Sequence, residues 1–290
     1  MFSYRHGFHA GNHADVLKHL VLVQLLQHLL KKDKPLWVID THAGGGGYDL
    51  TAGYATKNAE FETGIGVLWE RDDWPAAVAD YLTQVRALNA DGALRFYPGS
   101  PQIAAQMLRE HDPLRAYELH PTESRLLSAH FDDEAQPHAL SRRVSVQASD
   151  GFTGLKAALP PPSRRALVLI DPPYEDKADY RKVTTALKDA LKRFATGVYA
   201  VWYPQVQLTE SREFPAQLQR LAQQAGTGWL HASLTVKNPV PGGHGLHGSG
   251  IFVFNPAWTL SDALREALPY LLEVLGQDEG ADFELRYSKD

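Results

Sequence analysis

An acidic residue, two prolines and a tyrosine follow a fully apolar segment near the middle of the chain. The stretch reads ALVLIDPPYED over residues 166–176, and its β-favouring run ends at Asp171. Pro172 and Pro173 cannot donate backbone hydrogen bonds, so they end the strand and stiffen the turn. Tyr174 adds an aromatic ring. Because parallel α/β sheets bind ligands at the carboxyl ends of their strands, these residues form a candidate binding site.

A glycine-rich turn follows another predicted strand, over residues 35–40. The sequence there is DTHAGGGGY, with glycines at 44–47. Glycines allow a tight turn and a close approach of a ligand to the backbone. Four consecutive glycines match the dinucleotide-binding fingerprint loosely, and no Gly-Lys-Ser/Thr follows, as a phosphate-binding loop would require. Taken alone, the run is equally consistent with a flexible turn.

Two further predicted strands end in acids. The ELHP stretch places Glu118 at a strand end, and ASDGF places Asp150 and Gly151 at another. A cofactor that contains ribose needs an acid to bind the ribose hydroxyls, and Asp150 could accept a hydrogen bond from an exocyclic amine. Each acid alone is also consistent with a surface position or an ordinary Asp-Gly turn. Together with the glycine turn, they have the layout of a site for a cofactor with ribose and adenine.

Alternating strands and helices must position these residues. We predict a helix over about 13–32, with Asn12 as its N-cap and Asp15 near its positive end. We predict strands at 35–40, 115–121, 144–151, 166–174, 197–206, 229–238 and 249–258. Helical patterns at 123–130, 180–193 and 212–225 separate several of them, which predicts a mostly parallel, doubly wound sheet. The last two strands have no helix between them, so we expect them to be antiparallel.

The spacing of the sites indicates an insertion. The ribose-binding acid usually lies ~20 residues after the glycines, whereas Glu118 lies far beyond that. The intervening segment contains a helical pattern, WPAAVADYLTQVRALN, so we interpret residues 48–97 as a helical subdomain inserted into a single domain that spans 1–290.

Composition narrows the class of protein. The 290 residues include no cysteine, so disulfides and cysteine metal sites are excluded. The longest apolar run, from Leu20 to Leu30, is too short and too polar to span a membrane. We expect a cytoplasmic protein without a signal peptide and without a metal ion. The net charge of −5 argues against a general nucleic-acid coat, although arginine pairs at 142–143 and 164–165 could form a local basic patch.

These motifs together resemble a known family. The DPPY stretch resembles the [DNS]-P-P-[YFW] motif of amino-methyltransferases, which use S-adenosylmethionine. With YRHGFHAGNHADVLKH, DTHAGGG, YPGSP and ELHP, the chain resembles the RlmJ family of large-subunit rRNA adenine-N6 methyltransferases from Ser3 to Trp258. The resemblance implies a class I S-adenosylmethionine-dependent methyltransferase fold. Such a fold is Rossmann-like and seven-stranded, with the last strand antiparallel, and here it carries a small helical insertion.

The resemblance also implies site residues and a reaction. The family's cofactor contacts fall on His19, His42, Ser100, Glu118, Asp150, Gly151 and Asp171. Its N-terminal arm, which approaches the RNA, corresponds to Tyr4, His6 and Lys18. The implied reaction is methylation of an adenine N6 in 23S rRNA before full ribosome assembly, with no obligate protein partner. In this reaction Asp171 is catalytic, the Pro172 carbonyl accepts a second amine proton, and Tyr174 stacks on the adenine.

Three other functions are weighed against this one. A DNA adenine-N6 methyltransferase shares the four-residue motif but usually has a target-recognition domain, for which only the short insertion is available. A nucleotide-binding oxidoreductase is disfavoured by DPPY and by the divergent glycine run. A non-catalytic RNA-binding module is disfavoured by the acidic charge balance.

Overall fold

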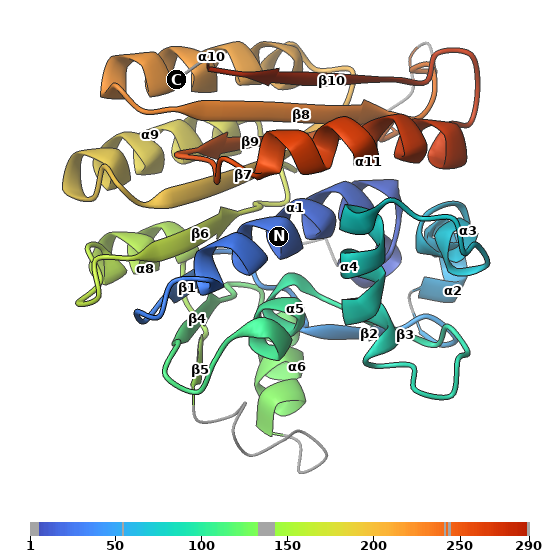
Figure 1. The fold of residues 1–290 in the computed structure, drawn as a ribbon, viewed down its shortest axis with the longest axis horizontal. Helices are drawn as coiled ribbons and strands as arrows, with labels where there is room; N and C mark the ends of the chain where they lie inside the picture. The colour runs from blue at the N-terminus through green and yellow to red at the C-terminus, as the bar shows by residue number, and fades with distance from the viewer. Residues whose placement is uncertain (1–5, 54, 133–142, 241, 243–244, 289–290) are drawn as a thin grey trace.

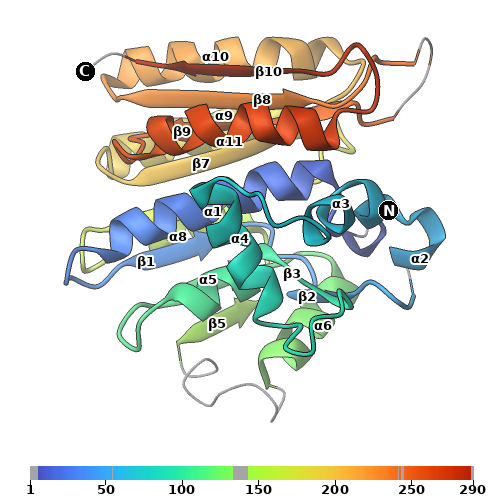
Figure 2. The same ribbon diagram turned by 45° about the vertical axis from the view of Figure 1, so that its right-hand side comes forward.

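A twisted sheet with helices on both faces forms the body of the molecule (Figure 1). The computed structural model describes residues 6–53, 55–132, 143–240, 242 and 245–288. Both views show α1, α4 and α11 in front of the sheet and α9 and α10 behind it (Figures 1 and 2). Among the helices of these ranges, none combines the length and the apolar character that crossing a membrane would require.

The bounds of the elements are as follows. The strands are β1 (Trp37–Asp40), β2 (Gly47–Asp49), β3 (Phe96–Pro98), β4 (Leu114–Tyr117), β5 (Val144–Gln147), β6 (Ala166–Ile170), β7 (Val198–Gln205), β8 (Trp229–Thr235), β9 (Gly248–Phe254) and β10 (Asp282–Tyr287). The helices are α1 (His13–Leu30), α2 (Ala55–Asn58), α3 (Ile65–Trp69), α4 (Ala76–Arg86), α5 (Ser100–Met107), α6 (Pro121–Asp132), α8 (Gly151–Ala158), α9 (Ala178–Arg193), α10 (Thr209–Ala225) and α11 (Leu260–Leu275). Two short 3-10 helices, η1 (His6–Phe8) and η2 (Glu60–Thr63), complete the set.

The strand order confirms the predicted class I methyltransferase topology. The main sheet runs β10-β8-β9-β7-β6-β1-β4-β5. Strands β5, β4, β1, β6 and β7 pair in parallel, and β9 is antiparallel to both β7 and β8. The seven predicted strands are all present, but the expected total of seven is wrong, because β10 adds an eighth strand antiparallel to β8. The sequence pattern of β10 was missed, as were helices α8 and α11.

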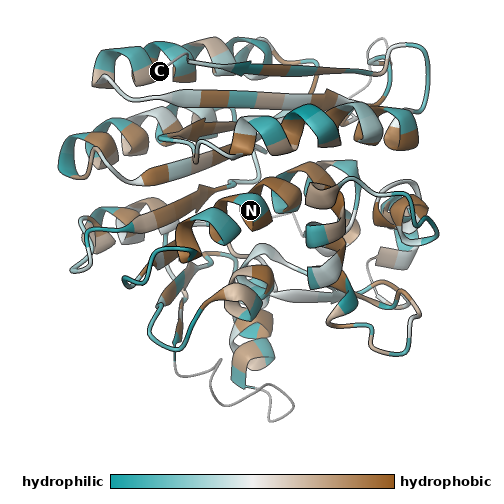
Figure 3. Ribbon diagram, viewed as in Figure 1, coloured by the Kyte–Doolittle hydropathy of each residue, from teal (hydrophilic) through white to brown (hydrophobic). Residues whose placement is uncertain are grey.

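Each face of the sheet has its own apolar core. Along β6, Leu167 and Leu169 pack toward α1, while Ala166, Val168 and Ile170 pack toward the helices of the opposite face. Such alternation is the two-residue period of a strand that is covered on both sides. Figure 3 shows the central strands as hydrophobic, whereas hydrophilic and hydrophobic stretches alternate along α10 and α11. Burial on both faces fixes the register of β6, and thereby places Asp171 at its carboxyl end.

Helix α1 is held at both ends. The Asn12 side chain accepts hydrogen bonds from the amides of Ala14 and Asp15, as expected of its N-cap. At the other end, Arg109 and Arg165 donate to backbone carbonyls between residues 29 and 34. Cations suit the negative end of a helix. Arg165, one of the two adjacent arginines at 164–165, therefore caps the C-terminal end of α1.

The segment 48–97, interpreted above as an insertion, has its two ends paired in a separate two-stranded sheet. Strands β2 and β3 pair antiparallel, with Tyr48 opposite Tyr97, so the ends of the segment meet. Helix α4 packs on α1 and α11. The insertion also approaches the start of α1 closely, where the Ile65 amide donates to the Gly11 carbonyl over 2.8 Å. A Cβ atom built on Gly64 would overlap that carbonyl oxygen and the Asn12 backbone.

We predict that Gly64→Ala destabilises the protein, because the added methyl group must push the insertion away from the N-terminus of α1. Overpacking of this kind costs about 1–3 kcal/mol. Urea denaturation followed by circular dichroism measures the loss. Gly245→Ala is the matched control, since a Cβ there meets nothing within 4 Å. Equal stability of the two variants would contradict the close contact.

Candidate active site

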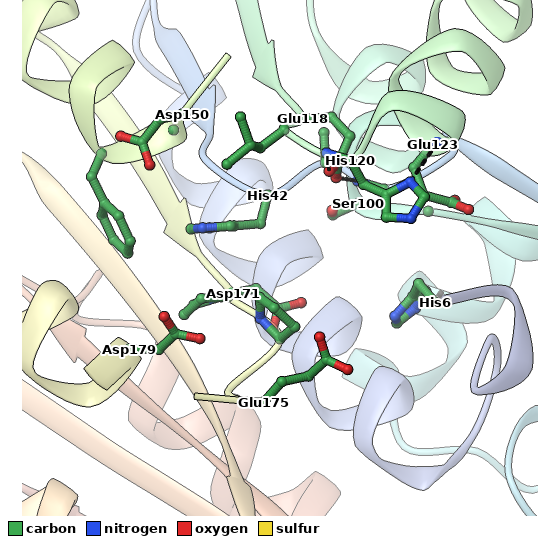
Figure 4. A pocket seen from close by; sticks show the side chains of 18 of the residues that line it. His6, His42, Ser100, Glu118, His120, Glu123, Asp150, Asp171, Glu175 and Asp179 are labelled. Atoms are coloured by element: carbon green, nitrogen blue, oxygen red, sulfur yellow. Dashed lines mark hydrogen bonds between the residues drawn. The ribbon is translucent and has the colours of Figure 1, made fainter. Parts of the chain in front are cut away.

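A cavity of about 580 Å³ opens at the carboxyl edge of the parallel strands. Its volume lies in the usual range for small-molecule sites. The residues that line it include His6, Lys18, His19, His42, Gly44, Ser100, Glu118, Asp150, Gly151, Asp171 and Pro172. Figure 4 shows His42, Glu118, Asp150 and Asp171 turned toward one common space. The structure thus brings together predicted residues from seven separate stretches of the chain.

Asp171 belongs to a buried chain of charged groups. Lys18 Nζ lies 2.6 Å from Asp171 Oδ2 and 2.9 Å from Asp15 Oδ1. Asp15 Oδ2 is 2.9 Å from His6 Nε2 and also accepts a hydrogen bond from the Gly11 amide. Lys18 and Asp15 are almost fully buried, at 4% and 2% exposure. One carboxylate, Asp15, therefore holds both the lysine that meets Asp171 and the histidine of the N-terminal arm.

Burial and neighbouring charges set the protonation of this chain. Burial raises the pKa of Asp171, and the ammonium of Lys18 offsets part of that rise. Burial opposes the charge on Lys18, but the charges of Asp15 and Asp171 outweigh it and raise the lysine pKa above its usual range. Burial also opposes the charge on Asp15, but His6 and Lys18 hold its pKa well below the usual value. Lys18 is therefore a permanent cation between two carboxyl groups.

The glycine turn is tied to Glu118. The amide of Gly44, which has a φ of 60°, donates to Glu118 Oε2 over 2.9 Å. The His120 amide donates to Glu118 Oε1 over 2.7 Å, and the Gly45 amide donates to the Tyr48 hydroxyl. Burial raises the pKa of Glu118, and these backbone donors offset part of the rise. Since protein acceptors already use the Gly44 and Gly45 amides, this turn is poorly suited to a pyrophosphate.

Asp150, Gly151 and His42 form a neighbouring wall. Asp150 caps α8 by accepting a hydrogen bond from the Thr153 amide over 2.7 Å. A Cβ on Gly151 would overlap the Thr41 carbonyl oxygen, so only glycine fits between β1 and α8. The His42 ring meets the Phe152 ring edge-on, with centroids 5.0 Å apart. Burial lowers the pKa of His42 to about 4, so this ring is neutral at pH 7.

His19 and Ser100 reach the cavity from the α1 side of the sheet. His19 Nδ1 is hydrogen-bonded to the Tyr97 hydroxyl over 2.8 Å, and that hydroxyl meets Tyr81 of the insertion. His19 Nε2 is buried and has no partner among the described residues. Burial lowers the pKa of His19 to about 3, so the ring is neutral at pH 7. In the tautomer in which Nδ1 accepts the hydrogen bond from the Tyr97 hydroxyl, Nε2 carries the hydrogen and can donate. Ser100 donates to Asp40 over 2.6 Å.

Two residues of the site were missed by sequence reasoning. Asp40 ends β1, and Asp171 directly follows β6. The pattern that indicated Asp171, an apolar strand with an acid at its end, could therefore also have indicated Asp40. Burial raises the pKa of Asp40 to about 6, and the hydrogen bond from Ser100 offsets part of the rise. Asp15 was interpreted only as an acid near the positive end of α1. No local pattern could show that it meets His6 and Lys18. Tyr4, a predicted RNA contact, lies outside the described residues.

Tyr174 does not lie where the sequence placed it. Its side chain is 6% exposed, and its hydroxyl donates to the Trp202 carbonyl over 2.7 Å. The ring packs against Tyr180 and Phe214, with centroids 4.6 Å and 6.0 Å away, on the α9 and α10 side of the sheet. The expectation that Tyr174 stacks on the substrate is therefore corrected. Its φ of 51° turns the side chain away from the cavity and into the core.

The cavity wall is acidic. Its lining contains the carboxylates of Glu118, Glu123, Asp150, Asp171, Glu175, Asp176 and Asp179, against the ammonium groups of Lys18 and Lys182. Such a wall favours a cationic ligand or a neutral base and repels phosphate groups. Across the described ranges, no cluster of three or more His, Asp or Glu side chains has the arrangement of a metal site.

Known proteins resemble this chain over most of its length. Residues 33–285 match the family model described as "Ribosomal RNA large subunit methyltransferase D, RlmJ". Proteins named ribosomal RNA large subunit methyltransferase J from Escherichia coli and Haemophilus influenzae are each 43% identical to this chain. The alignments cover 93% of both chains for the first, and 95% of this chain and 94% of the relative for the second. A crystal structure of a Legionella pneumophila protein superposes with a TM-score of 0.85 at 33% identity, covering 96% of this chain and 98% of the other.

We predict that Tyr174→Phe lowers stability, because the Trp202 carbonyl loses its hydrogen-bond donor while the ring still fills its place in the core. Loss of one such bond costs about 0.5–1.5 kcal/mol, and more if the carbonyl stays buried. Chemical denaturation measures this cost, and calorimetry with S-adenosylmethionine provides the control. Unchanged stability would contradict the hydrogen bond between Tyr174 and the Trp202 carbonyl.

Proposed function

The chain belongs to the RlmJ family of large-subunit ribosomal RNA methyltransferases, and from that premise we propose that it transfers a methyl group from S-adenosylmethionine to the exocyclic N6 of an adenine in 23S rRNA. The observation that carries the proposal is the position of Asp171 and Pro172. They follow β6 and line the same cavity as the strand-end acids Glu118 and Asp150. An acceptor pair for an amine thus lies beside a site with the features of a nucleoside pocket.

The residues present suit S-adenosylmethionine. Glu118 offers carboxylate oxygens for the ribose hydroxyls, while Asp150 and the Gly151 amide offer an acceptor and a donor for the adenine. The buried, unpartnered Nε2 of His19 can donate to an anionic group such as the carboxylate of the methionine moiety in the tautomer in which Nδ1 accepts from Tyr97. The acidic wall suits a ligand that carries a positive charge. When bound, this cofactor supplies a methyl group on a sulfonium, which is a strong electrophile.

The protein's task is to orient a weak nucleophile. The lone pair of an adenine N6 is delocalised into the ring, so positioning and charge placement supply the catalysis. Asp171 accepts one N6 proton and the Pro172 carbonyl accepts the other. No hydrogen bond to the Pro172 carbonyl is found within the described part of the chain. Two acceptors draw the amine out of conjugation. When N6 takes the methyl group and the bond from that carbon to the sulfonium sulfur breaks, Asp171 would take the proton that N6 loses. Lys18 stabilises the Asp171 carboxylate beforehand.

The same features argue against the alternatives. The acidic wall and the engaged glycine amides oppose the pyrophosphate of a nicotinamide dinucleotide. A target base must leave its stack to reach Asp171, which costs least in a single-stranded or looped region of RNA. The described part of the chain contains one insertion, packed on α1 and α11, rather than a separate domain for reading duplex DNA. Protein-free 23S rRNA, as it exists before ribosome assembly, is therefore the proposed substrate.

We expect wild-type protein to methylate protein-free 23S rRNA and Asp171→Asn to lose at least 100-fold in rate, because removing one positioned catalytic group typically costs about 10²–10⁴-fold. Incorporation of labelled methyl, followed by nucleoside analysis for N6-methyladenine, measures the outcome. Equal methylation of duplex DNA, or methyl groups on another atom, would overturn the proposal. A native circular dichroism spectrum of Asp171→Asn is the control for folding.

We predict that removing the charge of Lys18 and removing the charge of Asp15 shift the pH dependence of activity in opposite directions. Activity requires ionised Asp171, so it falls as the pH drops through the pKa of that group. Lys18 lowers the Asp171 pKa, and Asp15 raises it. Lys18→Met should therefore move the acid limb of kcat/KM to higher pH, and Asp15→Asn should move it to lower pH. Shifts in the same direction in pH–rate profiles would contradict the assignment of that limb to Asp171.

A further inference from the structure

The glycine turn at 44–47 holds an aromatic side chain at the wall of the cavity. A Cβ atom on Gly44 would overlap the Tyr48 hydroxyl, and the Gly45 amide donates to that hydroxyl over 3.1 Å. Gly45 borders one edge of the ring and Gly99 borders the other, where built Cβ atoms would lie 3.6 Å from Cε1 and 3.4 Å from Cε2. The turn therefore fixes the hydroxyl end of Tyr48 and leaves the side chain half-buried in the cavity lining.

The proposed reaction brings two adenines into this cavity, one from the cofactor and one from the RNA. Among the described residues that line it, two carry a phenyl or phenol ring, Phe152 and Tyr48. Phe152 directly follows Asp150 and Gly151, which suit the adenine of the cofactor. The ring of Tyr174 is turned into the core. Tyr48 is thus the ring that remains for the second adenine.

We propose that the target adenine stacks on the ring of Tyr48. This inference rests on the function proposed above. A base that leaves its stack loses the contacts of both its faces, and proteins commonly replace them with an aromatic side chain. Tyr48 meets the requirement for access, because its side chain is part of the cavity lining.

His6 places Tyr48 on the side of the cavity that faces the reacting group. The His6 and Tyr48 rings have centroids 5.3 Å apart and planes tilted by 54°, so the two rings form a corner and do not cover each other's faces. His6 Nε2 meets Asp15, which binds the lysine that contacts Asp171. Figure 4 shows His6 across the cavity from Asp171. A base whose N6 donates to Asp171 therefore extends toward this corner.

A neutral ring suits this acidic wall. Burial raises the pKa of Tyr48 well above its usual value, and the charge of Glu123 raises it further, so the phenol stays uncharged. Stacking on such a ring attracts a flat, neutral base without adding a charge, and it does not distinguish one base from another. Tyr48 therefore supplies affinity for the extruded base, while Asp171 and the Pro172 carbonyl select its exocyclic amine.

The test compares three variants in steady-state methylation of protein-free 23S rRNA. Tyr48→Leu should lower kcat/KM about 10-fold or more, since base–aromatic stacking is worth that much. Tyr48→Phe keeps the ring and should retain most of the rate. Tyr287→Leu is the matched control, because Tyr287 is also a strand tyrosine with an engaged hydroxyl, but it lies on the edge strand β10, away from the cavity. Calorimetry should show wild-type affinity for S-adenosylmethionine in all three.

Three results would overturn the inference. Wild-type kcat/KM in Tyr48→Leu would show that the base does not stack on this ring. A loss of cofactor affinity that matches the loss of rate would assign Tyr48 to the cofactor. Equal losses in Tyr48→Phe and Tyr48→Leu would assign the effect to the hydroxyl and its bond to the glycine turn. Failure of the wild type to methylate 23S rRNA would instead count against the proposed function, so the two failures are distinguishable.

Discussion

The buried ion pair between Lys18 and Asp171 is the constraint on which the rest of the site depends. It joins the first helix to the central strand across 153 positions of sequence. Removing both charges from water costs several kcal/mol, and one partner alone would leave an uncompensated buried charge. The pair is tolerated because Asp15 provides a second carboxylate to Lys18 and is itself bonded to His6 and the Gly11 amide. The Asp171 carboxyl group is therefore held in place by the same contacts that order the start of α1.

The remaining architecture supports this arrangement. Two apolar cores fix the register of β6, so that its carboxyl end meets the N-terminal half of α1. The insertion packs on α1 through Gly64 and supplies the tyrosine pair, Tyr81 and Tyr97, that orients His19. At the far end, Arg165 donates to the Leu29 carbonyl in the last turn of α1, and Arg109 donates to the Lys32 carbonyl just beyond it. The helix is thus immobilised from both ends.

The acidic character of the cavity explains how a negatively charged protein could act on RNA. Carboxylates around the pocket repel phosphates, so RNA would present a base to it rather than its backbone. The positive charge of the proposed cofactor and the neutral amine of the proposed substrate both suit such a wall. Recognition of the surrounding RNA would then fall to surfaces outside the cavity, which agrees with an overall charge of −5.

The sequence by itself determined the positions of the core strands along the chain, the helix cap at Asn12 and the acids at strand ends, because strand period, capping and breakers are local signals. It also determined the family, through several motifs spread along the chain. Only the tertiary structure decided that Tyr174 turns into the core, that Glu118 accepts the hydrogen bond of the Gly44 amide, and that β10 adds an eighth strand. It likewise decided that Asp15 lies at the centre of the charged chain. The direction and the partners of a side chain depend on elements that are distant in sequence, and no local pattern records which of them it will meet.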